Sequence, residues 1–298
     1  MRIRRTKLEI VFDIFNHTFL AFWGIIALYP MLYVLFASMS DAARLAAHRG
    51  LLLYPLGIDW TAYIRTLQHP LILSGYINTI IVVVAGTAVN IVMTALGAYF
   101  LSRKNVLWKT PIMIMIVITM YFGGGLIPTF LVVRQLGMVG SLTALIIPSA
   151  TNAFNIIVMR TAFMGIPDGL EEAAIIDGAG HFRVLFQIIL PVSKAILAVM
   201  ILWYGVGHWN SWFSASIYLT DRSQWPLQLV LRDILMVNMG GNSSLDGMVA
   251  DLDTAESAQI REVIRYAMII IATIPILFIY PFLQKHFAKG VMIGSLKG

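Results

Sequence analysis

The chain alternates between long apolar segments and shorter stretches that hold most of its charged residues. Each apolar segment approaches or exceeds the roughly 20 residues that a helix needs to cross about 30 Å of hydrocarbon. A spanning segment must satisfy its own backbone hydrogen bonds, so these segments are expected to be helices. The pattern therefore predicts an all-α polytopic membrane protein with six transmembrane helices. The predicted spans are residues 12–38, 76–101, 111–133, 141–162, 191–214 and 264–284.

Glycine and proline interrupt several of these segments, as is common in membrane helices. Gly123, Gly124 and Gly125 stand within the third segment and predict a bend or a packing point. Small residues recur in the second segment, where they allow a neighbouring helix to approach closely. These residues are Gly86, Ala88, Thr94, Ala95, Gly97 and Ala98.

The composition supports a membrane location. Of the 298 residues, 59% are hydrophobic and 12% are charged, and the mean hydropathy is +0.81. Soluble domains carry about 25% charged residues, so much of this apolar surface is expected to face lipid. The net charge of +6 does not indicate nucleic-acid binding, because the basic residues lie mostly at the ends of apolar segments. Cysteine is absent, which excludes disulfides, thiolate metal sites and a cysteine nucleophile.

The basic residues also predict the orientation. Four basic residues, Arg2, Arg4, Arg5 and Lys7, precede the first apolar segment, which raises the alternative of a cleaved signal peptide. The apolar segment is too long for one and lacks a small-residue cleavage site, so a retained helix is favoured. With the N-terminus inside, most basic residues fall on the cytoplasmic side, as the positive-inside rule requires. Both termini and the loop of residues 163–190 are then cytoplasmic.

The cytoplasmic loop 163–190 contains a short predicted helix. Pro167 and Asp168 are a helix-start signal, and acidic residues in the first turn suit the helix dipole. Gly178 or Gly180 is expected to end the helix after about ten residues. Ala173, Ala174 and Gly178 leave a flat surface that another protein can approach. The alternative is an amphipathic helix resting on lipid headgroups. The adjacent Glu171 and Glu172 argue against it beside an anionic leaflet.

This loop carries a resemblance to a known family. Glu172-Ala173-Ala174, Gly178 and Ile188-Ile189-Leu190-Pro191 match, with their spacing, the EAA signature of permease subunits of binding-protein-dependent ABC importers. Residues 289–298 look like the tail of the maltose-type second permease of the carbohydrate-uptake family. Residues 123–128, 207–212 and 225–229 resemble the branch for complex oligosaccharides and polysaccharides, such as alginate-type systems.

The resemblance implies a type I importer permease fold and a division of labour. It implies residues 1–75 as an N-terminal part, 76–284 as a core of five helices with the coupling loop, and 285–298 as a cytoplasmic tail. In the family the EAA helix is a coupling helix that seats in the ATPase subunit. The residues implied in that contact are Glu171, Glu172, Ala173, Ala174, Asp177, Gly178 and Ala179. The tail residues implied to reach the ATPase dimer are Gly294, Ser295, Leu296, Lys297 and Gly298, although Ser295-Leu296 departs from the commoner Ala-Val pair.

The implied partners are a second homologous permease, an ABC ATPase dimer, an extracytoplasmic solute-binding protein, a carbohydrate substrate and membrane lipid, in a bacterial cytoplasmic membrane. The chain has no G-x-x-x-x-G-K-[S/T] loop. ATP and Mg²⁺ are therefore expected on the partner ATPase, with no cofactor on this chain. The six histidines are scattered without ligand spacing, so no metal site is predicted. No catalytic set is visible either, and the chain is not expected to be an enzyme.

Polar and aromatic residues within the spans are candidates for a sugar pathway. On the fifth span Trp209, Trp212 and Phe213 lie at i, i+3 and i+4 and are expected to share one face, although an interfacial tryptophan belt or simple packing is the favoured interpretation. Asn152 and Asn155 form a polar pair at i, i+3 that faces either other helices or a cavity. The full candidate set is Tyr121, Asn152, Asn155, His208, Trp209, Asn210 and Trp212.

Three other classes of protein compete with an importer permease. A secondary transporter or channel predicts charged residues buried in mid-span, and the span centres are almost free of charge. A membrane enzyme predicts a clustered nucleophile, base or metal set. A passive anchor would need neither the interrupted helices nor the polar pairs. The sequence names neither the sugar nor the ATPase.

Overall fold

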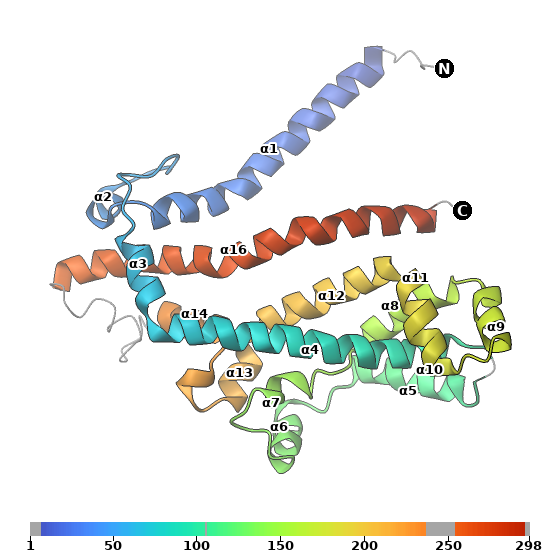
Figure 1. Ribbon diagram of the computed structural model, residues 1–298. Coiled ribbons are helices and arrows are strands. Elements are labelled where there is room, and N and C mark those ends of the chain that lie inside the picture. Colours follow the sequence, from blue (N-terminus) through green and yellow to red (C-terminus); the bar gives the residue numbers. More distant parts are fainter. Residues whose placement is uncertain (1–6, 105, 237–253, 296–298) are drawn as a thin grey trace. The chain divides into compact units, whose positions relative to one another are not determined.

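The computed structural model describes residues 7–104, 106–236 and 254–295, and the elements within these ranges are helical (Figure 1). The helices before the central loop are α1 (Lys7–Ser38), α2 (Ala42–Ala47), α3 (Thr61–Gln68), α4 (Pro70–Ser102), α5 (Lys109–Tyr121), α6 (Leu126–Gln135), α7 (Thr143–Ile146) and α8 (Ala153–Met164). They are followed by α9 (Asp168–Ile176), α10 (His181–Val184), a π-helical turn (Leu185–Ile189), α11 (Leu190–Val192), α12 (Lys194–Trp209), α13 (Trp212–Tyr218), a 3₁₀ turn (Arg222–Gln224), α14 (Leu227–Met236) and α16 (Thr254–Ser295).

The chain forms two compact units. The first contains residues up to His69 together with Asp233–Thr273, and the second contains Pro70–Arg232 together with the segment from Ile274. In the first unit the hydroxyl groups of Ser38 and Tyr63 are 2.7 Å apart, which joins α1 to α3. The sequence-based division at residues 75 and 284 is not tested by these units and stays a prediction.

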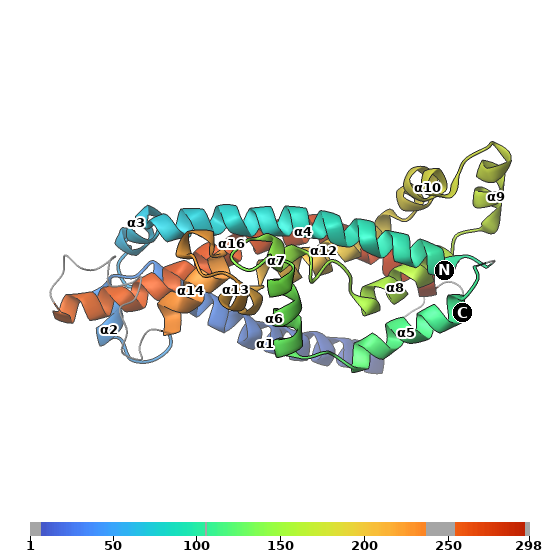
Figure 2. The same ribbon diagram turned by 90° about the horizontal axis from the view of Figure 1, so that it is seen from below.

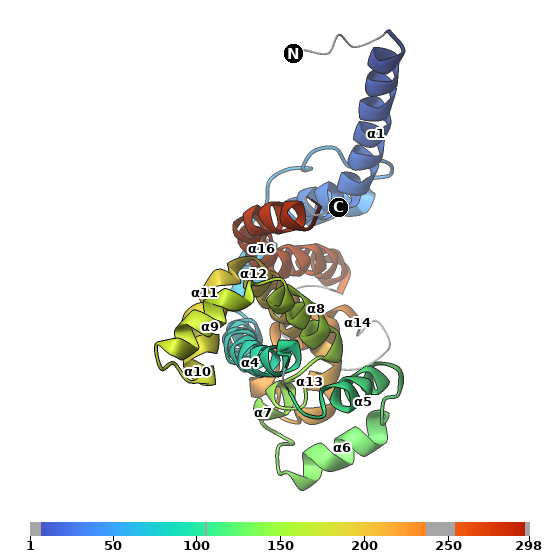
Figure 3. The ribbon, with the colours of Figure 1, turned by 90° about the vertical axis from the view of Figure 1, so that its right-hand side faces the viewer.

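Helix α4 is the centre of the second unit, where it packs against both α8 and α12 (Figure 1; Figure 3). Its buried residues recur every three or four positions, so they form one continuous stripe. Within it Gly86, Thr94, Ala95 and Ala98 are buried, which confirms the close approach predicted from small residues. The stripe also contains Asn90, which the sequence did not single out.

The described residues contain fewer continuous spans than the six expected. By length and composition α1 and α4 are long and apolar enough to cross a membrane, and two bent pairs of helices would raise that number to four. In one pair α5 and α6 meet at 114°, and in the other the segment His181–Val192 meets α12 at 89°. The six-span arrangement therefore stays a prediction.

The first bend lies at the predicted glycine run. Helix α5 ends at Tyr121 and α6 begins at Leu126, so the expected third span is not one straight helix. Gly125 adopts φ +83°, a left-handed conformation that glycine takes without steric cost. The glycines thus form a bend, which is one of the two roles expected for them.

Two further predictions of continuous helix are wrong. The segment 141–162 holds the four-residue α7 and then a non-helical stretch before α8. Pro148 lies in that stretch and has no N–H group to continue a helix, and Asn152 caps α8 by accepting a hydrogen bond from the Asn155 N–H group. In the segment 191–214, α12 ends at Trp209 and α13 begins at Trp212, so the predicted shared face of Trp209, Trp212 and Phe213 does not exist.

Candidate functional site

Helix α9 begins and ends at the signals expected from the sequence. Pro167 is its N-cap, Asp168 and Glu171 lie in its first turn, and it has nine residues. At its end the Ala179 N–H group donates to the Ala174 carbonyl and the Gly178 N–H group to the Ile175 carbonyl, both at 2.9 Å. This is the Schellman arrangement, which needs a left-handed residue after the helix. Gly178 supplies it with φ +83°, so Gly178 rather than Gly180 ends the helix.

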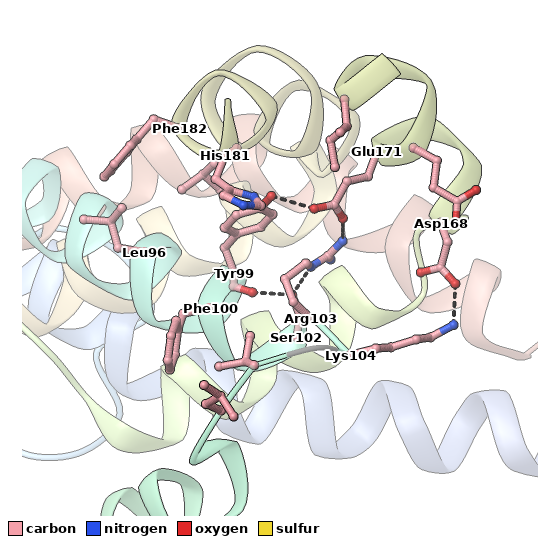
Figure 4. A pocket seen from close by; sticks show the side chains of 15 residues that line it. Leu96, Tyr99, Phe100, Ser102, Arg103, Lys104, Asp168, Glu171, His181 and Phe182 are labelled. Carbon is pink, nitrogen blue, oxygen red and sulfur yellow. Dashed lines mark hydrogen bonds and ion pairs between the residues drawn. The ribbon is translucent and has the colours of Figure 1, made fainter. Parts of the chain in front are cut away.

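One face of α9 points into the protein. Ala174 is buried in a core cluster that includes Tyr99 and Phe163, and the side chain of Glu171 is only 12% exposed. Glu171 pairs with the guanidinium group of Arg103 and accepts a 2.8 Å hydrogen bond from the Tyr99 hydroxyl (Figure 4). Glu171 and Ala174 therefore bind this chain's own core and do not belong to its exposed surface.

A second ion pair joins the same two regions in solvent. Lys104 donates to Asp168 at 2.5 Å, and the two side chains are 79% and 54% exposed. The hydrogen bond and charge of Lys104 lower the pKa of Asp168, and the pKa of Lys104 is raised by the same partner. Because water screens exposed pairs, this contact contributes little to stability.

The opposite face of α9 is exposed. Glu172, Ala173, Asp177 and Gly178 lie on it, and it continues in the large apolar side chain of Ile176, which is 85% exposed. The prediction of a flat surface of small residues is thus partly confirmed. Ala173 and Gly178 are exposed to solvent, and a Cβ atom added to Gly178 would meet no atom within 4 Å.

Ala179 differs from its neighbours because it is half-buried and packs against the core cluster. Of the seven residues implied in partner contact, the structure exposes four and turns Glu171, Ala174 and Ala179 toward the core.

A pocket of about 840 Å³ lies between the C-terminal end of α4 and the helices α9 and α10. Figure 2 shows α9 and α10 beside that end of α4. The two ion pairs line the pocket together with apolar side chains, among them Phe100 and Phe182 (Figure 4). The chain then continues to Pro191, and an 89° corner at Ser193 leads into α12.

The candidate pathway residues are not brought together at one place. His208 is buried, and its Nε2 atom donates to the Oδ1 atom of Asn90 at 2.6 Å. Asn90 in turn donates to the Ser149 carbonyl at 2.5 Å. His208 is thus part of a polar chain that joins α12, α4 and the non-helical stretch before α8. The sequence missed Asn90 because its partners are 59 and 118 residues away.

The two tryptophans also have separate surroundings. Trp209 is buried against the edge of Tyr76, with ring centroids 6.3 Å apart, and its Nε1 atom has no hydrogen-bond partner among the described residues. Trp212 is half-buried, and the guanidinium carbon of Arg232 lies 3.5 Å from its ring centroid. This cation–π contact was not foreseen, although both residue types are common in such pairs.

The remaining candidates lie at helix ends. Tyr121 and Asn210 are exposed, and the Asn210 side chain donates to the Val206 carbonyl of its own helix. Asn155 is buried, whereas Asn152 is exposed and lines a second pocket, of about 620 Å³, between α5 and α8. Thr119 and Phe154 line the same pocket.

The predicted tail contact lies mostly outside the described residues. Gly294 and Ser295 are the last residues of α16, and Leu296, Lys297 and Gly298 fall beyond the described range. The implied role of the tail stays a prediction.

Comparison with known proteins gives a consistent result over the whole chain. The family described as "Binding-protein-dependent transport system inner membrane component" matches residues 104–293. The chain is 38% identical to the polygalacturonan/rhamnogalacturonan transport system permease protein YtcP of Bacillus subtilis, over 97% of this chain and 99% of that protein. It is 40% identical to protein LplC of Bacillus subtilis, over 99% of this chain and 98% of LplC.

A solved structure shares the fold. It is the crystal structure of a bacterial ABC transporter involved in the import of the acidic polysaccharide alginate, one chain of which matches with a TM-score of 0.86 and 33% identity. The match covers 96% of the present chain and 99% of the other. At this identity and coverage the similarity extends beyond the local EAA signature to nearly the whole chain.

Proposed function

Because this chain belongs to the family of binding-protein-dependent transport system inner membrane components, we propose that it is the permease subunit of an ATP-driven importer for oligosaccharides or polysaccharides. The observation that carries the proposal is the full-length similarity to a permease named for polygalacturonan and rhamnogalacturonan. The similarity to a chain of the alginate importer supports the same class of substrate. The family consists of transport components, so the chain is a transport subunit and not an enzyme.

The proposed assembly contains this permease, a second homologous permease, an ATPase dimer and an extracytoplasmic solute-binding protein. The exposed face of α9 supports an ATPase contact, because it combines small residues with charged ones and lies opposite the face that packs on the core. Glu172, Ala173, Asp177 and Gly178 are the residues we assign to that contact. ATP and Mg²⁺ act on the partner ATPase.

The proposed topology has six spans with both termini in the cytoplasm. The distribution of basic residues supports it, since cytoplasmic segments are enriched in lysine and arginine. One of the proposed spans is bent where α5 meets α6, and the 89° corner before α12 lies where the cytoplasmic loop meets the fifth proposed span. Non-helical backbone at membrane depth is tolerated where it is covered by protein or lines a cavity, which suits the stretch before α8.

The transport mechanism is a two-state switch. ATP binding closes the ATPase dimer and moves α9, and the helices joined to α9 then open the central cavity to the other side. We place the substrate path near Asn152, because Asn152 lines the 620 Å³ pocket with Thr119 and Phe154. Hydroxyl and amide groups beside an aromatic ring suit a sugar.

The first experiment is to tag the chain, extract it gently from its native membrane and identify its stoichiometric partners by mass spectrometry. The proposal expects a second permease and a P-loop ATPase. The purified complex is then placed in proteoliposomes with ATP inside and the binding protein outside. Uptake of oligogalacturonides and of neutral oligosaccharides is measured, with an ATPase variant lacking its P-loop lysine as the control.

ATP-dependent uptake of one of these sugars is the expected result. Uptake that needs no ATPase and follows a proton or sodium gradient would overturn the proposal in favour of a secondary transporter. Such a transporter also predicts that the chain is purified without an ATPase.

A further inference from the structure

Arg103 is the residue at which three helices meet. It follows the end of α4, pairs with Glu171 on α9, and its second terminal nitrogen lies 3.5 Å from the Phe163 carbonyl near the end of α8. Its Nε atom donates to the Ser102 hydroxyl at 3.0 Å. Its guanidinium carbon also lies 4.9 Å from the centre of the Tyr99 ring, so the group is held from several sides.

The carboxylate group of Glu171 is also fixed by more than one partner. Its two carboxylate oxygens have different partners, because one pairs with Arg103 and the other accepts the Tyr99 hydroxyl hydrogen. The side chains of Arg103 and Glu171 are only 16% and 12% exposed. A shielded pair with additional hydrogen bonds has a defined geometry, and removal of one member leaves the other charge without compensation.

The position of this pair on α9 is what gives it a functional meaning. The partner-facing residues Glu172, Ala173 and Ile176 lie on the exposed face, whereas Glu171 lies on the inner one. Helix α9 therefore stands between the surface that another subunit can move and the ends of α4 and α8. A displacement of α9 reaches those helices through its inner contacts, which are the burial of Ala174 and the polar contacts of Glu171.

We propose that the ion pair between Arg103 and Glu171, braced by Tyr99, transmits the movement of α9 to the cytoplasmic ends of α4 and α8. Arg103, Glu171 and Tyr99 are positioning residues in this role, since they act on the cavity through the helices and do not touch the substrate. The inference rests on the proposed function and adds to it an intramolecular step. Without the pair, α9 still moves with the ATPase, but its movement is not transmitted to α4 and α8.

The test compares two ion pairs that join the same two regions. Glu171→Gln removes the charge of the shielded pair and keeps the shape of the side chain. Lys104→Gln is the matched control, because it breaks the solvent-exposed pair with Asp168. Each complex is assembled in proteoliposomes, and three quantities are measured: the ATPase bound per permease, the rate of ATP hydrolysis, and the sugar imported per ATP hydrolysed.

The proposal expects Glu171→Gln to bind the ATPase normally and to hydrolyse ATP, while import per ATP falls by about tenfold or more. Lys104→Gln is expected to keep import per ATP near the wild-type value. Wild-type coupling in an assembled Glu171→Gln complex would overturn the proposal. A wild-type complex without ATP-driven import would instead overturn the proposed function, so the two failures are distinguishable.

A second variant separates transmission from loss of folding. The chain has no cysteine, so Arg103→Cys with Glu171→Cys introduces the only two thiols that it carries. The reduced double variant is expected to be uncoupled. A short bismaleimide that joins the two thiols replaces the ion pair by a covalent link and is expected to restore import per ATP. An assembled, cross-linked complex that stays uncoupled contradicts the proposal, as does a reduced one that is fully coupled.

Discussion

The imidazole ring of His208 lies so close to Gly86 that a Cβ atom on Gly86 would stand 2.5 Å from its Nε2 atom. The absence of a side chain at Gly86 leaves room for the His208 ring between α4 and α12, and this close contact packs the ring against the α4 backbone. It also fixes the ring where it donates to Asn90. Glycine at position 86, which lacks the methyl group of alanine, therefore permits both the close packing of the His208 ring and its buried hydrogen bond to Asn90.

The first prediction is that Gly86→Ala disrupts this contact. The new methyl group cannot be accommodated without moving His208, and His208 is buried and bonded to Asn90. Overpacking of this kind costs about 1–3 kcal/mol. Thermal unfolding of the purified permease in detergent is expected to show a lower midpoint, and import by the assembled complex is expected to fall.

Gly97→Ala on the same helix is the control for that experiment. Its Cβ atom would stand 3.6 Å from the nearest atom of Ile156, which is an ordinary contact. The control is expected to keep or raise the unfolding midpoint, because alanine is favoured over glycine in a helix interior by up to about 1 kcal/mol. Equal midpoints for Gly86→Ala and Gly97→Ala would show that the His208 ring moves aside freely and would contradict the prediction.

The second prediction concerns the polar chain through Asn90. Asn90→Ala removes both the acceptor of the His208 hydrogen and the donor to the Ser149 carbonyl. Hydrogen bonds between membrane helices contribute on average about 0.6 kcal/mol each, so a loss of about 1 kcal/mol is expected. Denaturation of the permease in mixed micelles measures it. Asn210→Ala is the control, because its exposed amide bonds only within α12, and an equal loss in both variants would contradict the assigned role.

The sequence was sufficient for the class of protein and for the local features of α9. Segment length and hydropathy predict helices, because backbone groups inside a membrane must form hydrogen bonds within their own segment. Pro167 at the N-cap and Gly178 after the last turn set the ends of α9 through their local backbone conformation. The EAA signature indicated the family, which the comparisons then confirmed.

The sequence was not sufficient where a structure depends on distant partners. The inward direction of Glu171 is decided by Arg103, which is 68 residues away, and nothing near Glu171 distinguishes it from the exposed Glu172. Hydropathy likewise does not register the break before α8 or the end of α12 at Trp209. Polar residues stand at both places, such as Thr151 with Asn152 and Asn210 with Ser211, but they are too few to lower the mean hydropathy of a span-length segment. An apolar run limits where a helix can cross and does not require the helix to be continuous.

The third prediction concerns the end of α9. Gly178 has φ +83° and no atom within 4 Å of an added Cβ, so Gly178→Ala introduces backbone strain without a clash. The expected cost is about 1 kcal/mol, seen as a lower unfolding midpoint. Gly178→Asn is expected to recover part of the loss, because asparagine tolerates the left-handed conformation.

Gly169 is the matched control for Gly178, since it lies at the start of α9, also has free space around its Cβ position and does not have a positive φ. Gly169→Ala is expected to keep or raise the midpoint, because alanine is favoured over glycine within a helix by up to about 1 kcal/mol. If Gly178→Asn restores stability but import stays low, the loss lies in the docking of the larger side chain against the partner. If Gly178→Ala is as stable as the wild type, the assigned strain is wrong.

The last prediction uses the different exposure of the two ion pairs at α9. The pKa of Asp168 is lowered from 3.8, so its contribution is present above that value and is lost as the pH falls through the lowered pKa. The pKa of Lys104 is raised from 10.5, so its contribution is present below that value and is lost as the pH rises through the raised pKa. Between about pH 5 and about pH 9 the pair therefore stays charged on both sides, and its effect does not depend on pH.

Salt, in contrast, is expected to distinguish the pairs. At about 1 M salt the Debye length is about 3 Å, so any difference in unfolding midpoint between the wild type and Lys104→Gln is expected to disappear. The difference between the wild type and Glu171→Gln is expected to persist, because protein covers most of the Arg103 and Glu171 side chains. Unfolding midpoints at low and high salt, each at three pH values within this range, test both statements. The assignment of the Arg103–Glu171 pair as the one that holds α9 to the core would be reversed by either of two results. One is a midpoint difference for Lys104→Gln that salt does not change, and the other is a midpoint difference for Glu171→Gln that salt abolishes.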